Sequence, residues 1–442
     1  MVRPRYKAIV DRFASAIRSG DLPAGSRLPA HRALAREHGI ALATATRVYA
    51  ELAEAGLVVG EPGRGTYVRD TTGYAGAEPR RIARARRVAD LSFGQPTTPG
   101  QGGVLREGLR RLAATGDIDA LLTQPPPEGR AADRSALATH LLGVGVDAPP
   151  DDVLLTCGAQ HGLDTAVRAL TRPGEVIAVD GLTYPGMKLT ADLHGVELAP
   201  VRHTPAGMDP EALDGLCRRR GVAAVYTMPT VHNPLGTVMD GERRSALVAV
   251  ARRHGLLLVE DGTHAFLVPD APPPLQALAP ERTVHVTSLS KSLATGLRFG
   301  ALIAPPALRA RLTRALRTST WGGPPIIGAL VTGWLRDGTV AELERQRRAE
   351  ARRRQRLAAR LLHGLDYRAH PASQFGWLRL PREPRPATVA RDLAERGVLV
   401  STEEAFAVVR HPAPALRLSL ASPPSTAVLE LALEEVRSVL PV

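Results

Sequence analysis

From about residue 91 onward, short apolar runs alternate with helical patterns. Five of these runs are "DVLLT", "EVIAVD", "AAVYTMP", "GLLLVED" and "TVHVTSLSK", all within residues 152–291. This alternation predicts a mainly parallel sheet covered by helices, because parallel strands are joined by crossover connections. Ligands of such sheets bind beyond the carboxyl ends of the strands. We therefore expect an α/β body with its functional residues just after these runs.

The length of 442 residues exceeds one ordinary domain and fits a small module joined to a large body. No apolar run approaches the roughly 18 residues of a membrane helix. The start "MVRPRYKAIVDRF" lacks the apolar segment of a signal peptide. Cys157 and Cys217 show neither metal nor redox spacing, so we expect a reducing cytoplasm and no metal site.

The net charge of +13 favours a polyanionic partner. Residues 1–90 hold sixteen Lys and Arg against nine Asp and Glu, which places +7 in a fifth of the chain. A second basic stretch, Arg345–Leu361, predicts a helix with Leu357 and Leu361 on one side and arginines on the others. We interpret it as a solvated helix that leads into the last subdomain. The alternative is a supplementary DNA contact.

The first seventy residues predict three helices and a hairpin. The first helix has apolar residues at helical spacing: Tyr6, Ile9, Val10, Phe13 and Ile17. The second is "HRALAREH", closed by Gly39, and the third runs over about residues 43–55 and ends at Gly56. "LVVG" and "TYVR" are strand-like and are joined by the glycine-bearing turn "EPGRG". Together these elements predict a winged helix-turn-helix over residues 1–70.

The segments "IRSGDLPAGSRLPAHRALAREHGI", "RVYAELAEAGLV" and "GRGTYVRD" resemble the GntR-type DNA-binding domain over its full length. The resemblance implies that the partner is a double-stranded DNA operator. It assigns DNA contacts to Arg32, Thr44, Thr46, Arg47 and, on the wing, Arg64. Arginine can bond guanine in a bidentate manner, and threonine hydroxyls suit phosphates. The alternative is that these side chains only solvate helix faces. Leu42 stands where the family commonly has arginine, which puts the base contacts in doubt.

Residues 71–90 lack apolar periodicity and are rich in Gly, Ala and Arg. They predict a basic linker between the head, residues 1–70, and a body over residues 91–442.

The strand-like runs of the body lead into residues that suit a flat, phosphate-bearing cofactor. Gly158, Ala159 and Gln160 would offer backbone N–H groups at a helix start, which is a natural phosphate site. Tyr184 could stack on a flat ring, and Glu260–Asp261 place a carboxylate at a strand tip. Each feature taken alone is also explained by ordinary packing.

In this order and spacing, the set resembles the fold-type I pyridoxal-phosphate proteins over residues 91–442. With the fused winged helix it most resembles the MocR subfamily of GntR-type regulators. The resemblance implies a small α+β subdomain beside the main sheet, and Lys291 in "SLSKSLATGLRFG" as the Schiff-base lysine of pyridoxal 5'-phosphate. The further cofactor contacts that it implies are Gly158, Ala159, Gln160, Tyr184, Asn233, Asp261, His264, Ser288 and Arg298. Arg417 would grip a ligand carboxylate through its bidentate fork, and Gly94 in "FGQP" would approach from the opposite side.

Several positions depart from the enzymes of this group. A tyrosine usually follows the ring aspartate by two or three residues, where this chain has Thr263 and His264. A second tyrosine is replaced by Gln124, and a common proline by Thr295. These departures favour the capture of a ligand at Lys291 over completed amino transfer.

These observations predict a cytoplasmic, homodimeric DNA-binding transcription regulator that carries pyridoxal phosphate. Its effector would be a small amine or amino acid, or pyridoxal phosphate itself. The main alternative is an active aminotransferase whose winged helix is vestigial or autoregulatory. A plain DNA binder with an inactive body is disfavoured, because the cofactor residues are too complete.

Overall fold

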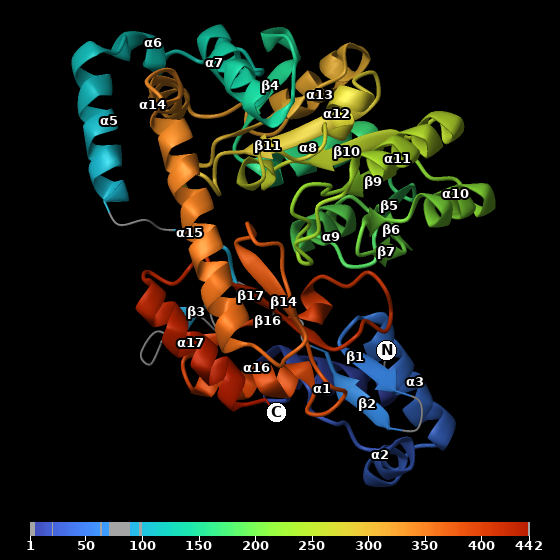
Figure 1. The fold of residues 1–442 in the computed structure, drawn as a ribbon. Helices are drawn as coiled ribbons and strands as arrows, with labels where there is room; N and C mark the ends of the chain where they lie inside the picture. Colours follow the sequence, from blue (N-terminus) through green and yellow to red (C-terminus); the bar gives the residue numbers. More distant parts are fainter. Residues whose placement is uncertain (1–4, 20, 62–63, 70–88, 97–99, 441–442) are drawn as a thin grey trace.

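The computed structural model describes residues 5–19, 21–61, 64–69, 89–96 and 100–440. The chain forms a small N-terminal head, a large subdomain around a seven-stranded sheet, and a small subdomain that lies beside both (Figure 1). Most of the predicted linker, residues 71–88, lies outside the described residues. Ala89–Asp90 form strand β3 and pair with β15 (Val398–Leu399), so these two residues are part of the small subdomain.

The head has the predicted three helices and hairpin. They are α1 (Arg5–Ser19), α2 (His31–His38), α3 (Leu42–Glu54), β1 (Val58–Glu61) and β2 (Gly65–Val68). The helices enclose a core in which Leu34, Ala45, Val48 and Leu52 are fully buried. Gly39 ends α2 in the left-handed conformation, at φ 59°, which explains why glycine stands there. The predicted winged helix-turn-helix is confirmed.

The sheet of the large subdomain has the order β4-β12-β11-β10-β9-β5-β6. Its strands are β4 (Val153–Thr156), β5 (Val176–Asp180), β6 (Glu197–Val201), β9 (Ala224–Thr227), β10 (Leu257–Asp261), β11 (Thr283–Ser288) and β12 (Gly300–Ile303). β12 is antiparallel to both of its neighbours, and the other pairs are parallel. The prediction of a mainly parallel sheet is therefore confirmed. The carboxyl ends of β5, β9, β10 and β11 meet at one edge.

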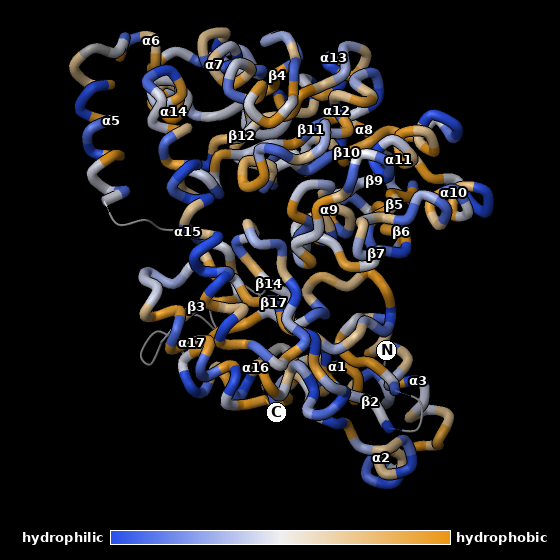
Figure 2. Tube along the Cα trace, in the orientation of Figure 1, coloured by the Kyte–Doolittle hydropathy of each residue, from blue (hydrophilic) through white to orange (hydrophobic). Residues whose placement is uncertain are grey.

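Helices cover this sheet, and its strands are largely hydrophobic (Figure 2). The covering helices are α7 (Ala131–Leu141), α8 (Ala159–Leu170), α9 (Pro185–Leu193), α10 (Pro210–Arg219), α11 (Gly241–His254), α12 (Leu275–Leu278), α13 (Pro306–Arg317) and α14 (Pro325–Arg336). Two further helices, α5 (Gln101–Thr115) and α6 (Ile118–Leu122), lie on the outside of the large subdomain (Figure 1). A short hairpin of β7 (His203–Thr204) and β8 (Gly207–Met208) follows β6. No helix in the described ranges is long and apolar enough to cross a bilayer.

The small subdomain is an antiparallel sheet of order β13-β14-β17-β16 with helices packed against it. Its elements are β13 (Tyr367–Arg368), β14 (Phe375–Arg379), β16 (Ser401–Thr402), β17 (Ala415–Ser419), α16 (Pro386–Glu395) and α17 (Thr426–Ser438). The long helix α15 (Thr339–Leu361) connects it to the large subdomain (Figure 1).

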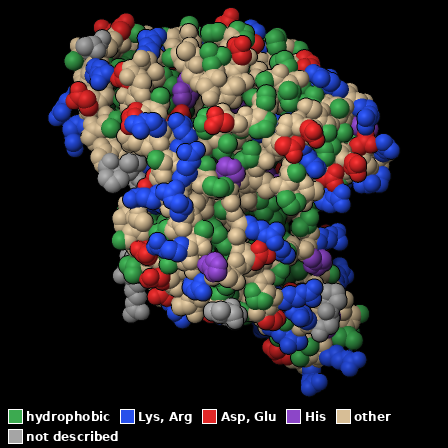
Figure 3. Space-filling model, in the orientation of Figure 1, with side chains coloured by type: hydrophobic (Ala, Val, Ile, Leu, Met, Phe, Trp, Pro, Cys, Tyr) green, Lys and Arg blue, Asp and Glu red, His purple; other side chains and the backbone are tan. Residues whose placement is uncertain are grey.

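Helix α15 is not solvated on all of its arginine-bearing sides. Many of its Arg side chains reach the surface (Figure 3), but Arg347 and Arg354 are each only 4% exposed. Arg347 donates to the carbonyl of Pro96 at 3.2 Å, and Arg354 donates to that of Leu420 at 2.6 Å. The sequence pattern missed this because the accepting carbonyls come from distant parts of the chain.

Candidate functional site

A cavity of about 140 Å³ lies between the carboxyl edge of the large sheet and the small subdomain. The large subdomain supplies most of its lining, and Ser401, Phe406 and Arg417 come from the small subdomain. The predicted cofactor residues that line it are Ala159, Gln160, Tyr184, Asn233, Asp261, His264, Ser288, Lys291 and Arg298. The fold therefore brings together residues that are more than 250 positions apart.

Lys291 follows β11 and points toward the segment before α5. Its Nζ donates a 2.6 Å hydrogen bond to the carbonyl of Gly94 and lies 5.3 Å from the ring centroid of Phe93. Burial lowers the pKa of Lys291 to about 8, with further lowering from Arg417 and Arg298. A neutral amine is the nucleophilic form, so this environment suits attack on a carbonyl.

Asp261 ends β10 and is 2% exposed. Its carboxylate accepts 3.0 Å hydrogen bonds from the hydroxyl of Tyr226 and from the backbone N–H of Thr263. Burial raises the pKa of Asp261, and these two hydrogen bonds oppose that rise. A buried carboxylate of this kind is stabilised by a cationic partner, such as a protonated ring nitrogen.

Some polar atoms of the cavity are buried without a hydrogen-bonding partner among the described residues, and Oδ1 of Asn233 and Nδ1 of His264 are two of these atoms. Unsatisfied buried polar atoms are costly, so they suit a site where a bound group completes their hydrogen bonds. Burial, together with Lys291 and Arg417, lowers the pKa of His264 to about 3, which keeps the imidazole neutral.

The amino end of α8 forms one end of the site. Gly158 precedes the helix at φ 81°, and a Cβ there would lie 2.9 Å from Nη2 of Arg298. Glycine therefore lets Arg298 cross the helix start, where it donates to the carbonyl of Cys157 at 3.1 Å. The first N–H groups of a helix have no partner within the helix and favour anions. This combination of helix start and guanidinium suits a phosphate.

The side chains of Ser288 and Gln160 form hydrogen bonds with neighbouring protein groups. Ser288 Oγ lies 3.0 Å from the carbonyl of Phe299 and 2.9 Å from Oγ of Ser290. Ser290 also lines the cavity, although sequence reasoning passed over it. The side-chain amide of Gln160 donates to the carbonyl of Gly186 at 3.1 Å, so it holds α9 against α8.

Tyr184 stands at the start of α9, and its ring lies close over Gly186. A Cβ at Gly186 would come within 2.3 Å of Tyr184 Cε1, so the ring needs glycine at this place. Among the described residues that line the cavity, Tyr184 is the one tyrosine. Thr263 and His264 line it at the positions where the sequence departs from the usual tyrosine, and Gln124 is exposed outside it.

Arg417 lies in the middle of β17 and is 6% exposed. Its guanidinium carbon lies 5.3 Å from the ring centroid of Phe406 and 5.9 Å from that of Phe375, and it donates to the carbonyl of Ser92. Sequence reasoning missed both phenylalanines. Phe375 lies on β14, where an apolar residue is normally part of the core, and Phe406 follows the short turn Glu403–Ala405. Their role becomes visible only in the structure, where both rings line the cavity.

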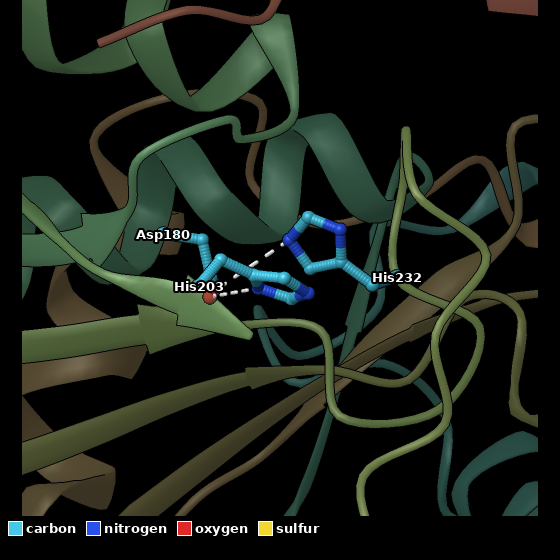
Figure 4. Close-up of side chains that lie close together, drawn as sticks. All are labelled: Asp180, His203 and His232. Carbon is cyan, nitrogen blue, oxygen red and sulfur yellow. Dashed lines mark hydrogen bonds and ion pairs between the residues drawn. The ribbon is translucent and has the colours of Figure 1, made fainter. Parts of the chain in front are cut away.

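A second polar cluster lies beside the cavity and is formed by Asp180, His203 and His232 (Figure 4). His203 Nδ1 lies 2.7 Å from Asp180 Oδ1, and His232 Nε2 lies 3.4 Å from Asp180 Oδ2. Thr227 donates to the same carboxylate at 3.0 Å, and His203 Nε2 lies 3.1 Å from Thr237 Oγ1. Burial would raise the pKa of Asp180, but the two histidines hold it well below its usual range.

These three residue types can bind metals, and the sequence analysis did not find the cluster. The carboxylate of Asp180 already has three hydrogen-bonding or ionic neighbours, two of them histidines. We therefore interpret the cluster as a brace. It ties the end of β5 to His232 and so fixes the loop that carries Asn233.

The residues assigned to DNA lie on two surfaces of the head. Arg32 on α2, and Thr46 and Arg47 on α3, are exposed, whereas Thr44 is half-buried. Thr46 Oγ1 donates to the carbonyl of Leu42 at 3.1 Å, within its own helix. Lys and Arg side chains gather at this outer end of the head (Figure 3). Arg64 lies on the other surface, which faces the small subdomain.

Arg47 and Arg64 each have a partner within the chain. The guanidinium carbon of Arg47 lies 4.4 Å from the ring centroid of Tyr6, and its Nε lies 3.7 Å from Glu51. Arg64 lies on the wing and pairs with Glu383 of the small subdomain at 3.4 Å.

Family comparisons agree with this architecture. Residues 86–436 match the family described as aminotransferase class I and II, and residues 5–68 match the gntR family of bacterial regulatory proteins. The first family implies pyridoxal phosphate as the cofactor. The residues present fit this cofactor. Asn233 Oδ1 is buried without a hydrogen-bonding partner among the described residues, and Gly158 leaves room for Arg298 at the start of α8.

Three relatives are named as HTH-type transcriptional regulators. YdeF of Bacillus subtilis, described as uncharacterized, is 26% identical over 99% of this chain and 95% of its own. TauR of Rhodobacter capsulatus is 29% identical over 88% of this chain and 87% of its own. The pyridoxine biosynthesis regulator PdxR of Corynebacterium glutamicum is 28% identical over 70% of this chain and 68% of its own.

Two solved structures with this fold are aminotransferases. An archaeal alanine:glyoxylate aminotransferase superposes with a TM-score of 0.76 at 24% identity, covering 82% of this chain and 94% of that one. The aspartate aminotransferase of Thermus thermophilus superposes with a TM-score of 0.73 at 24% identity, covering 82% and 95%. These likenesses show the fold. The chain belongs to the aminotransferase class I and II family and joins that domain to a GntR-type winged helix-turn-helix, the combination that distinguishes the MocR subfamily of GntR-type regulators.

Proposed function

We propose that this protein is a pyridoxal-phosphate-dependent transcription regulator that binds an operator through its head and senses an amino compound in its cavity. One observation carries the proposal. A GntR-type head is joined to a cavity that keeps Lys291, Asp261 and Arg417 but has Thr263 and His264 where an orienting tyrosine usually stands.

Each residue of the cavity would have one task. Pyridoxal phosphate, when bound, supplies a carbonyl that amines attach to reversibly and a ring that withdraws electrons. Lys291 would hold the cofactor covalently, and Asp261 would pair with its ring nitrogen. Asn233 would bond its phenolic oxygen, and Tyr184 and His264 would contact the ring. Its phosphate would lie among the N–H groups of Gly158, Ala159 and Gln160, with Ser288 and Arg298 beside them.

Arg417 would bind the carboxylate of an amino acid effector. Its burial against Phe375 and Phe406 supports this role, because a guanidinium held out of water binds a carboxylate more strongly than an exposed one. Pyridoxal phosphate itself remains the alternative effector.

We further propose a division into a DNA-binding head over residues 1–70, a linker, and an effector body that begins at β3. The body would form a cytoplasmic homodimer. Four apolar side chains on α5 and α6 support a self-interface, since they are 37–81% exposed: Leu105, Leu109, Ile118 and Leu122.

The second candidate function is a working aminotransferase, which the retained Lys291, Asp261 and Arg417 favour. A titration of the cofactor-loaded protein with an amino acid panel separates the two. For a regulator we expect a change in the visible spectrum, altered DNA affinity, and amino transfer to a keto acid slower than the ~1 s⁻¹ lower range of typical enzymes. Turnover at ordinary enzymatic rates without any effect on DNA affinity would favour the aminotransferase.

A further inference from the structure

The wing of the head packs against the start of α16 in the small subdomain. Arg385 Nη2 lies 2.6 Å from a carboxylate oxygen of Glu61, and its guanidinium carbon lies 3.4 Å from the ring centroid of Tyr67. The Arg385 side chain is only 18% exposed. Arg64 of the wing pairs with Glu383 at 3.4 Å. The contact therefore combines two ion pairs of opposite polarity with one cation–π stack.

The same contact brings the turn before α2 onto α16. A Cβ at Gly25 would lie 3.3 Å from Cβ of Ala387 and 3.4 Å from Oγ1 of Thr388. Residues 383–388 thus touch the head at the wing and at this turn. We call residues 383–388 the wing-docking surface.

We propose that the wing-docking surface holds the wing away from DNA, so that docking and operator binding compete for the same side chains. The inference rests on the proposed regulatory function and deepens it. One guanidinium cannot pair with Glu383 and enter a DNA groove at the same time. Tyr67, covered by Arg385, is likewise closed to a second partner on that ring face.

The contact is built so that it can separate. Beside it lies an open cleft of about 760 Å³, whose walls include Arg69, Arg382 and Arg410. The interface is therefore polar and incompletely packed, which is typical of domains that move relative to one another. The exposed Arg64–Glu383 pair contributes little to docking, which leaves the Arg385–Glu61 pair and its stack as the main contact, so a modest difference in free energy can shift the docked population.

One short segment borders both the cavity and the cleft. Ser401, Ala405 and Phe406 line the cofactor cavity, whereas Thr402, Glu403 and Glu404 line the cleft. Ser401 donates to the carbonyl of Ser92 at 2.8 Å, which joins this segment to the strand leading to Gly94. A ligand that moves the segment would therefore change the wall beside the docked wing.

Charge reversal and rescue at Arg385 and Glu61 provide the test. The full-length protein is compared as wild type, Arg385→Ala, Glu383→Gln, Arg385→Glu and the swap Glu61→Arg/Arg385→Glu. Arg391→Ala is the matched control, because Arg391 lies on the same helix and pairs with the neighbouring Asp392. Affinity is measured by fluorescence anisotropy on a duplex selected by the wild type from a random-sequence library. Small-angle X-ray scattering without DNA reports docking separately.

We expect Arg385→Ala and Arg385→Glu to enlarge the radius of gyration and to tighten DNA binding about three- to tenfold, the range of one ion pair with a stack. Glu383→Gln should act in the same direction, the swap should return toward wild type, and Arg391→Ala should change neither measurement. Unchanged scattering and affinity in both Arg385 variants would overturn the inference. If the scattering changes in the Arg385 variants but no duplex is ever bound, the docking contact is supported and the proposed regulatory function is rejected.

Discussion

The hydroxyl of Tyr226 donates a 3.0 Å hydrogen bond to the carboxylate of Asp261, and both side chains are almost fully buried. Tyr226 lies on β9 and Asp261 ends the adjacent strand β10, so two parallel strands together fix the carboxylate. The hydrogen bond also opposes the rise in the pKa of Asp261 that burial causes. It therefore helps to keep Asp261 ionised toward the cavity.

Tyr226→Phe should weaken pyridoxal phosphate binding about two- to tenfold, since one net hydrogen bond contributes about 0.5–1.5 kcal/mol. The dissociation constant is obtained by titrating apoprotein and following absorbance. Tyr367→Phe serves as the control, because its hydroxyl bonds Gln355 within the small subdomain. Equal affinity of Tyr226→Phe and wild type would show that Asp261 needs no support from β9.

Covalent attachment of pyridoxal phosphate should follow the titration of Lys291. Burial, Arg417 and Arg298 lower its pKa from 10.5 to about 8, so the reactive neutral amine appears at a lower pH than in an ordinary lysine. The rate of attachment should rise with pH around 8. Because the unfolded chain keeps its proton up to about 10.5, the contribution of Lys291 to the free energy of unfolding should increase from pH 8 to that value.

The measurement is the growth of the visible cofactor band in apoprotein between pH 6 and 11, with Lys291→Ala as the variant that cannot form it. A midpoint close to 10.5 would contradict the depressed pKa. A persistent covalent band in Lys291→Ala would move the attachment point to another lysine.

Arg417→Lys should lose preference for ligands with a carboxylate. The charge is retained but the bidentate fork is not, and hydrogen bonds to charged groups contribute about 1.5–3 kcal/mol. Alanine should therefore bind about ten- to a hundredfold more weakly, while ethylamine, which lacks the carboxylate, should bind almost as before. Spectral titration of the loaded protein gives both constants. A parallel loss for the two ligands would indicate a general disturbance of the cavity.

Arg32→Ala should weaken operator binding by about 1–3 kcal/mol if Arg32 contacts a base, and binding by the wild type should fall steeply with added salt. Arg36→Ala is the control, since it removes an exposed arginine from the same helix. Anisotropy on operator and random duplexes gives the comparison. An equal loss on both would assign Arg32 to the phosphate backbone, and no loss would remove it from the interface.

Arg244→Met should destabilise the large subdomain by about 3–5 kcal/mol, because several buried acceptors lose their donor. Arg244 is fully buried, and it donates to the carbonyls of Pro229, Met239, Pro272 and Pro273 and to Oγ1 of Thr230. Urea unfolding followed by circular dichroism measures the effect. Arg243→Met, at the half-buried neighbouring position, should change the free energy of unfolding by less than about 1 kcal/mol.

Local sequence determined the elements and most of the candidate cofactor residues. The helices of the head, its hairpin and the strands ending at Asp180, Asp261 and Ser288 follow from periodicity and from glycine positions, which act over a few residues. Because parallel strands end at a common edge, the strand pattern predicted where a ligand would bind, and the resemblance to fold-type I proteins predicted that Asn233, Asp261 and Lys291 line that site.

Only the tertiary structure decided which side chains have partners. Phe375 and Phe406 surround Arg417, and Arg347 and Arg354 are buried against carbonyls, through contacts with residues far away in the sequence. The wing-docking surface is of the same kind, since Arg64 and Glu383 are 319 positions apart. Hydrophobic periodicity encodes which face of an element is buried, but it does not encode which distant element covers that face.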